Sequence, residues 1–263
     1  MGRAVEVVTG RVTNPGATIT ALTANTGNSF TVRSFPSTSM AWLEGMWTQQ
    51  ATAGVFRIRS PKMHDSTQGI RYRTPAAVIR DFISDSQASR MYPTDVLTVE
   101  QSGGGAEVDA AAYQIYYEDL DGADQRLVSY EQIRGSIVDL VTIEVAVTGP
   151  TTSGDWSAGN ALNSAFDLLK ADTKYAILGY QCDTESLAVG IQGPDTSNYR
   201  LGGPGCIEPL ETRDLFVRQS LASGRPHIPV LNSNNRGGTL VSVAKVGAGG
   251  TVNVCLSAAE LAG

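Results

Sequence analysis

The chain has 263 residues, of which 41% are hydrophobic and 17% are charged, and its formal net charge is −6 at pH 7. This composition excludes an intrinsically disordered chain, and the length suits one large β-domain or two domains of about 130 residues each. The negative charge disfavours a surface that wraps nucleic acid, because neutralising phosphates requires clustered Lys and Arg. One local cluster could face a polyanion, but we expect it to lie on solvated strand faces paired with Asp and Glu: Arg57, Arg59, Lys62, Arg71, Arg73 and Arg80.

Short β-strands are predicted along the first half of the chain. Residues 55–59 read V-F-R-I-R, and apolar residues at every second position predict one buried and one solvated face. Thr74 and Pro75 are typical of a helix start, which predicts a helix over residues 76–84. Strands are expected at residues 5–12, 17–23, 30–35, 40–50, 55–59, 70–73, 96–100 and 112–118.

The second half is predicted to follow an acidic turn at residues 119–124. A short helix is expected at residues 126–133, and Asn160 is expected to cap a helix at residues 161–171. The strongest strand signal is IVDLVTIEVAV, residues 137–147. Further strands are expected at residues 175–180, 187–192, 215–217, 228–231, 240–246 and 252–256.

A repeated pattern links the two halves. Residues 173–200 and residues 29–57 each contain a short strand, a polar turn, a second apolar run and an Arg-containing segment. Aligning residues 30–35 with residues 175–180 gives an offset of about 145 residues, which predicts one β-module used twice. With few helices and no alternation of strand and helix, the chain is predicted to be all-β and to form two antiparallel sandwiches, residues 1–122 and 123–263.

Cysteine usage and the termini predict a protein made in the cytosol. The three cysteines are odd in number and widely spaced, so we expect buried free thiols, with one bridged pair as the alternative in an oxidising setting: Cys182, Cys206 and Cys255. No run of eighteen apolar residues suits a membrane span, and the N-terminus lacks the apolar stretch of a signal peptide. We therefore expect a soluble protein.

No motif assigns a catalytic, cofactor-binding or metal-binding residue, and we predict that the protein is not an enzyme. Residues 247–250 are glycine-rich but lie between two predicted strands, which favours a hairpin turn over a phosphate-binding loop. We expect both histidines, His64 and His227, in surface loops. The acidic turn at Asp119, Asp121 and Asp124 lacks the remaining ligands of a calcium loop.

Other side chains could take part in chemistry only if the fold brings them together. Paired carboxylates suit sugar hydrolysis, and the candidates, which cannot be ranked, are Glu44, Asp81, Glu118 and Glu185. No nucleophile elbow surrounds Ser136, Ser153 or Ser186. The tryptophans could stack on a carbohydrate, but we expect core or inter-domain packing: Trp42, Trp47 and Trp156.

The duplication, the helix expected at residues 76–84 and the helix expected at residues 161–171 give the chain an architecture that resembles the double jelly-roll major capsid proteins of tailless icosahedral viruses, including bacteriophages. The resemblance implies two consecutive eight-stranded jelly rolls, a homotrimer that forms a pseudo-hexagonal capsomer, and location in the virion after synthesis in the host cytoplasm. It implies self-association into a shell lattice, contacts with minor capsid or vertex proteins, and no sequence-specific nucleic-acid binding. It also implies mobile terminal segments at residues 1–12 and 257–263. Contact with an underlying membrane or genome is left open.

Two other functions fit a β-rich chain without a reaction motif. One is a carbohydrate- or receptor-binding sandwich, such as the head of a fibre or adhesin, which would expose the tryptophans. The other is a jelly roll with glycosidase-like activity, which would bring two carboxylates together.

Overall fold

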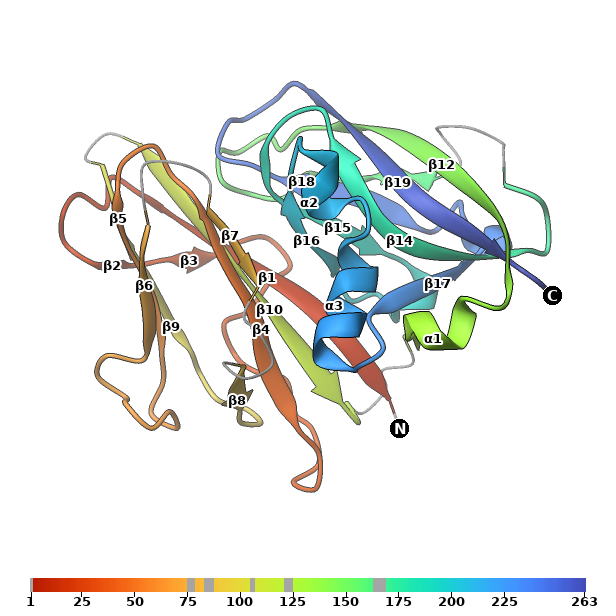
Figure 1. Ribbon diagram of the computed structural model, residues 1–263. Helices are drawn as coiled ribbons and strands as arrows, with labels where there is room; N and C mark the ends of the chain where they lie inside the picture. Colours follow the sequence, from red (N-terminus) through yellow and green to blue (C-terminus); the bar gives the residue numbers. More distant parts are fainter. Residues whose placement is uncertain (1, 75–78, 83–87, 105–106, 121–124, 163–168) are drawn as a thin grey trace.

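The computed structural model describes residues 2–74, 79–82, 88–104, 107–120, 125–162 and 169–263. Over these residues the protein is all-β, and its strands form four antiparallel sheets connected by loops and short helices (Figure 1). Two sheets are built from residues 3–118, which we call the N-terminal half. The other two are built from residues 127–261, which we call the C-terminal half.

The N-terminal half contains the first and second sheets. The first sheet consists, in spatial order, of β3 (Thr23–Ala24), β1 (Arg3–Thr13), β10 (Val108–Glu118), β4 (Ala41–Gln49) and β7 (Ile79–Phe82), with β8 (Ser89–Met91) also paired to β4. The second sheet consists of β2 (Thr20–Ala21), β9 (Thr98–Ser102), β5 (Gly54–Arg59) and β6 (Ile70–Thr74).

The C-terminal half contains the third and fourth sheets. The third sheet consists of β11 (Leu127–Val128), β17 (Ile228–Asn232), β14 (Lys174–Cys182), β19 (Thr251–Leu261) and β12 (Ile137–Thr148). The fourth consists of β13 (Asn160–Ala161), β18 (Leu240–Ala244), β15 (Ser186–Gln192) and β16 (Leu201–Gly205). The α-helices described are α1 (Tyr130–Ile133), α2 (Pro209–Thr212) and α3 (Leu215–Ser223), and two 3-10 helices are η3 (Pro194–Thr196) and η4 (Ser233–Asn235).

The strand order of the N-terminal half recurs in the C-terminal half. The run β1-β10-β4-β7 of the first sheet corresponds to β12-β19-β14-β17 of the third sheet, and β2-β9-β5-β6 of the second corresponds to β13-β18-β15-β16 of the fourth. β14 therefore matches β4, whose first residue, Ala41, precedes Lys174 by 133 positions. The predicted alignment of residues 30–35 with residues 175–180 is wrong, because residues 30–35 precede β4 and make only an isolated bridge between Thr31 and Val96 in place of the expected strand. Short apolar runs between polar turns look alike wherever they fall.

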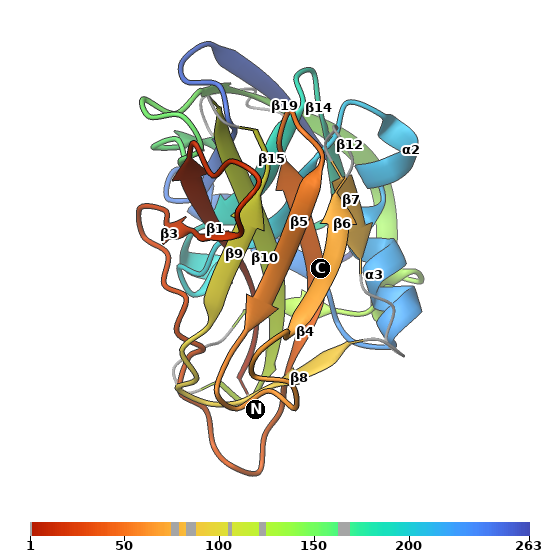
Figure 2. The same ribbon diagram turned by 90° about the vertical axis from the view of Figure 1, so that its left-hand side faces the viewer.

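The four sheets lie in layers, in the order second, first, fourth and third (Figure 1). One core lies between the second and first sheets, and another lies between the fourth and third. Figure 2 views the molecule from the side of the second sheet, with β9, β5 and β6 nearest the reader. The alternation predicted for β5 is confirmed, since Phe56 and Ile58 are fully buried whereas Arg57 and Arg59 are half-buried.

The helix predictions differ most from the structure. Residues 79–82 are a strand that pairs with β4, so the helix expected at residues 76–84 is wrong there, and its other residues lie outside those described. The helix expected at residues 161–171 falls largely outside them too, and Ala161 is in β13. Conversely, the strand expected at residues 215–217 is the start of α3, which ends at Ser223 and is capped by Gly224 with a φ of 68°.

The terminal segments are structural strands. β1 pairs along its whole length with β10, and β19 pairs with both β12 and β14. Val5, Val7 and Val8 of β1 are buried on both faces of the first sheet. The expectation of mobile segments is therefore wrong for residues 3–12 and 257–261, because these residues supply hydrogen bonds within the first and third sheets.

Candidate functional site

Burial separates the outer faces of the sheets into those already covered within the chain and those that remain open. The outer face of the first sheet packs on the fourth sheet through Val7, Trp47, Ala110, Ala112, Trp156, Leu187, Ala188 and Ala244. Small alanines on β10 allow the two sheets to approach closely. The Trp47 Nε1–H donates to the carbonyl of Leu187 at 2.5 Å, and the Val7 N–H donates to the carbonyl of Arg200 at 2.9 Å.

Loops reinforce this junction with polar contacts. The Trp156 Nε1–H donates to Asn28 Oδ1 at 3.0 Å, and the Arg200 guanidinium lies 4.2 Å from the centroid of the Trp156 ring. Burial lowers the pKa of Arg200 to about 10. The carboxylate of Asp155 accepts hydrogen bonds from the Thr26 N–H and hydroxyl, both at 3.0 Å. Trp47 and Trp156 are thus buried, which confirms the expectation of packing for these two tryptophans.

A buried charged cluster joins the halves at the other end of the junction. Glu44 on β4 accepts a hydrogen bond from Arg225 Nη1 at 2.6 Å, and its second oxygen lies 2.7 Å from His227 Nε2. The guanidinium of Arg225 stacks 4.1 Å from the Trp42 ring, and the His227 ring lies 5.0 Å from that of Tyr116. We call these five residues the Glu44 cluster.

The Glu44 cluster corrects one expectation and places one sequence candidate. His227 is 1% exposed in its side chain and bridges the halves, so its assignment to a surface loop is wrong. Glu44, a candidate acid for sugar hydrolysis, is held by a guanidinium and an imidazole inside the junction. Because this ion pair is shielded from water, removing one partner would leave the other as an unpaired buried charge and destabilise the contact between the halves. The pairing links residues that are 181 and 183 positions apart, so no local pattern marks it.

The outer face of the second sheet is basic. Arg57 and Arg59 on β5 both bind the largely buried Glu100 on β9, with Nε to Oε2 distances of 2.7 and 2.8 Å. Burial raises the pKa of Glu100, but the hydrogen bonds and charges of Arg59 and Arg57 outweigh it and hold that pKa below the ordinary value. Strand register places Arg71 opposite Arg57, on the same face. The prediction of strand-face arginines paired with acid is confirmed for Arg57 and Arg59.

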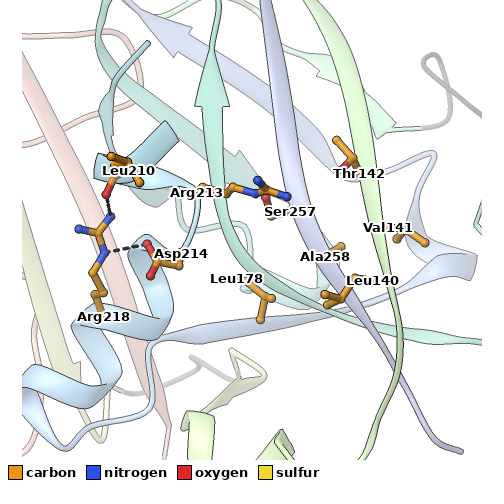
Figure 3. A pocket seen from close by; sticks show the side chains of 10 residues that line it. All are labelled: Leu140, Val141, Thr142, Leu178, Leu210, Arg213, Asp214, Arg218, Ser257 and Ala258. Carbon is orange, nitrogen blue, oxygen red and sulfur yellow. Dashed lines mark hydrogen bonds and ion pairs between the residues drawn. The ribbon is translucent and has the colours of Figure 1, made fainter. Parts of the chain in front are cut away.

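The outer face of the third sheet carries a groove with a volume of about 510 Å³ (Figure 3). Its floor comes from β12, β19 and β14, and α2 with the start of α3 forms one wall, through Leu140, Val141, Thr142, Leu178, Leu210, Arg213, Asp214, Arg218, Ser257 and Ala258. Arg218 fixes this wall, because it binds Asp214 at 2.7 Å and donates to the carbonyl of Leu210 at 2.6 Å.

Large apolar side chains are exposed in and beside this groove. Leu140 is 65% exposed and Leu210 87%, and Val138 on β12 is 62% exposed. The sequence of β12 contains a signal for this exposed apolar surface that the sequence analysis did not use. Residues 137–141 are apolar on both faces of β12 except at Asp139, whereas Thr142 and Glu144 restore the alternation further along. Leucine and valine at these outward positions give the third sheet an exposed apolar patch.

One buried carboxylate lies apart from these surfaces. Asp109, at the start of β10, is fully buried, and neither of its carboxylate oxygens has a hydrogen-bond partner among the residues that the structure describes. Burial, followed by the negative charge of the neighbouring Glu107, raises the pKa of Asp109 to about 7. In the folded protein the carboxyl group of Asp109 therefore stays mainly protonated up to near-neutral pH.

Asp109→Asn is expected to stabilise the protein at pH 8 by about 1–2 kcal/mol more than at pH 5, after a discount for solvent screening. The folded-state pKa is raised, so the wild-type free energy of unfolding falls as pH rises from about 4 to about 7, whereas the amide does not titrate. Urea unfolding of both proteins at the two pH values measures this difference. Glu107→Gln is the control, because removing the neighbouring charge should weaken the wild-type pH dependence. An equal gain for Asp109→Asn at pH 5 and pH 8 would contradict the assignment.

The remaining sequence candidates do not converge. Residues 247–250 form the predicted turn between β18 and β19, with positive φ at Gly249 and Gly250. His64 is exposed, as expected, while Asp121, Asp124 and the side chain of Asp81 lie outside the described set. Glu118 and Glu185 are half-buried. Across the described ranges, no three His, Cys, Asp or Glu side chains gather closely enough to hold a metal ion.

The cysteines and helices complete the survey. The side chains of Cys182 and Cys206 are buried, as predicted, and that of Cys255 is half-buried. None of the helices in the described part of the chain has the length and apolarity needed to span a membrane.

Comparisons with known proteins leave the function to be inferred from this geometry. No protein-family model matches the chain, and a search of curated proteins finds no match. Among solved structures, the crystal structure of the PBSX exported protein XepA matches with a TM-score of 0.28 and 9% sequence identity, covering 98% of this chain and 86% of that one. A similarity this low indicates neither a common fold nor a common function.

Proposed function

We propose that this protein is a structural shell protein, a major capsid protein whose two halves are consecutive jelly rolls and whose copies form trimeric, pseudo-hexagonal capsomers of an icosahedral virion. The observation that carries the proposal is the repeated strand order. We leave β3, β8 and β11 aside and number the remaining eight strands of each half from 1 to 8 along the chain. In both halves, the spatial order of the strands is then 1-8-3-6 in one sheet and 2-7-4-5 in the other. Two four-stranded sheets connected in this way are the arrangement of a jelly roll.

The junction between the halves supports the proposal further. A buried apolar patch and the Glu44 cluster join the halves face to face, so that one chain already presents two similar sandwiches side by side. Three such chains offer six similar units, which suits a ring with nearly sixfold packing. We place the boundary between the sandwiches at residues 122 and 123, in a stretch outside the described residues. We assign the protein no catalytic role, cofactor or metal, and its partners are other copies, with minor capsid or vertex proteins as further partners.

The proposal predicts a defined assembly state. In size-exclusion chromatography with light scattering, the full-length protein should elute with three times the 27.8 kDa mass of the chain, or as a larger particle. Negative-stain images of the same fractions should show plates with sixfold outlines or closed shells. Trimers with a stalk-like or irregular outline would favour a receptor-binding head. A monomer at all concentrations would contradict the proposal.

A further inference from the structure

The contact between the two halves uses the outer faces of the first and fourth sheets and leaves the outer faces of the third and second sheets open. Within the chain, the outer face of the first sheet is covered by the outer face of the fourth sheet. The strand order makes the third sheet the counterpart of the first, and the second sheet the counterpart of the fourth. The outer face of the third sheet is thus equivalent to that of the first, and the outer face of the second sheet is equivalent to that of the fourth. Within one molecule, however, the third and second sheets do not pack on each other.

Strand register identifies the equivalent positions. Val7 pairs with Gln114, the seventh residue of β10, and Thr142 pairs with Ser257, the seventh residue of β19. By the same count Val5 of β1 corresponds to Leu140 of β12, because their partners, Tyr116 and Ala259, are both ninth in their strands.

The outward positions are buried on β1, where the fourth sheet covers them, and exposed at the equivalent positions of β12, where no described sheet of the same chain covers them. Val5 is 1% exposed and Val7 is fully buried, whereas Leu140 is 65% exposed and Thr142 is exposed. β1 is buried on both faces over most of its length, and β12 only on its inner face, at Ile143, Val145 and Val147. The third sheet thus retains apolar outward residues without the covering sheet that the first sheet has.

The two open faces carry opposite charges beside the groove, while the groove itself contains Arg213 and the paired Arg218 and Asp214. The second sheet presents Arg57, Arg59, Arg71 and Arg73, of which Arg57 and Arg59 already bind Glu100. At one end of the outer face of the third sheet, Glu144 and Asp183 are exposed on either side of Cys255. Opposite charges on facing surfaces orient the encounter and select against other pairings.

We infer that the groove on the third sheet binds the second-sheet face of a neighbouring copy, head to tail, in the way that the first sheet binds the fourth within the chain. This inference rests on the proposed function and assigns the surfaces that perform it. The contact is heterologous, so each copy uses one face toward each of two neighbours, and a fixed rotation between copies closes the ring. Leu140, Val138 and Leu210 become buried, and the arginines of the second sheet lie near Glu144 and Asp183.

The test uses one variant on each face of the full-length protein, measured by sedimentation velocity. Leu140→Arg places a charge in the groove, and the double variant Arg71→Glu with Arg73→Glu reverses the basic face; each should weaken trimer formation by at least about tenfold. Leu221→Arg and Arg134→Glu are matched controls at exposed positions outside both faces, and should assemble like the wild type. Circular dichroism melting checks that the variants fold, since all these side chains are exposed.

Mixing the two face variants distinguishes this contact from other modes. Each retains the face that the other lacks, so an equimolar mixture should form one-to-one dimers that cannot close into rings. A face that pairs with the same face of its neighbour would give no such mixed dimers. Trimeric wild type with trimeric Leu140→Arg would overturn this inference and leave the proposed function standing. A monomeric wild type would overturn both.

Discussion

Glu44→Ala is expected to lower the free energy of unfolding by about 3–5 kcal/mol, because it leaves the charge of Arg225 and the imidazole of His227 in the junction without their shared carboxylate. The loss exceeds that of an ordinary ion pair since the side chains of Glu44 and His227 are only 7% and 1% exposed. Urea unfolding monitored by circular dichroism measures it directly.

The matched control for Glu44 is Glu131→Ala, which removes the partner of Arg134 in an exposed ion pair on α1. That change should cost no more than about 1 kcal/mol, because water solvates both groups once they separate. Glu44→Gln should fall between the two, since the amide oxygen can still accept from Arg225. Equal losses for Glu44→Ala and Glu131→Ala would show that the Glu44 cluster does not hold the halves together.

Trp47→Ala should destabilise the protein by about 3–5 kcal/mol through the cavity that it opens between the first and fourth sheets. Because Trp47 points out of the core of its own half, the cost reports on the contact between the halves. Intrinsic fluorescence and circular dichroism followed during the same urea titration would measure the loss. They would also reveal whether the two halves then unfold in separate steps.

Trp47→Phe separates the hydrogen bond from the packing. Phenylalanine fills most of the space but cannot donate to the Leu187 carbonyl, so its cost should be that of the bond and the residual gap, about 1–2 kcal/mol. Leu221→Ala, at a 57% exposed position on α3, is the control and should change stability by less than about 0.5 kcal/mol. A Trp47→Ala loss as small as that control would contradict the packing of the halves on this residue.

Some elements could be predicted because their signal is local. The V-F-R-I-R run folds as β5 with Phe56 and Ile58 inside, and the glycine-rich stretch at residues 247–250 turns between two strands as its neighbours require. Local signals failed where a distant partner competed with them. Residues 79–82 carry part of a helical stripe, yet they pair with β4. Helix propensity is a weak preference that hydrogen bonding to a neighbouring strand overrides.

The Glu44 cluster shows why the junction was beyond sequence reasoning. Glu44 and His227 each look ordinary in their own segments, and their partnership depends on two sandwiches meeting at one orientation. The same holds for the repeat. Similarity of pattern aligned residues 30–35 with β14, whereas the hydrogen-bond order of the sheets matches β14 with β4.

Alternation of apolar and polar residues, set by the pleat of each strand, was sufficient to predict an all-β chain, whereas the matching strand order of the two halves came from the structure. That alternation reports whether one face of a strand is apolar, but it does not report what covers the face. Val5 and Leu140 occupy equivalent positions on equivalent strands, and either residue suits a buried site. The stacking of the first sheet on the fourth buries one and leaves the other exposed, since burial is a property of neighbours in space and not of the strand itself.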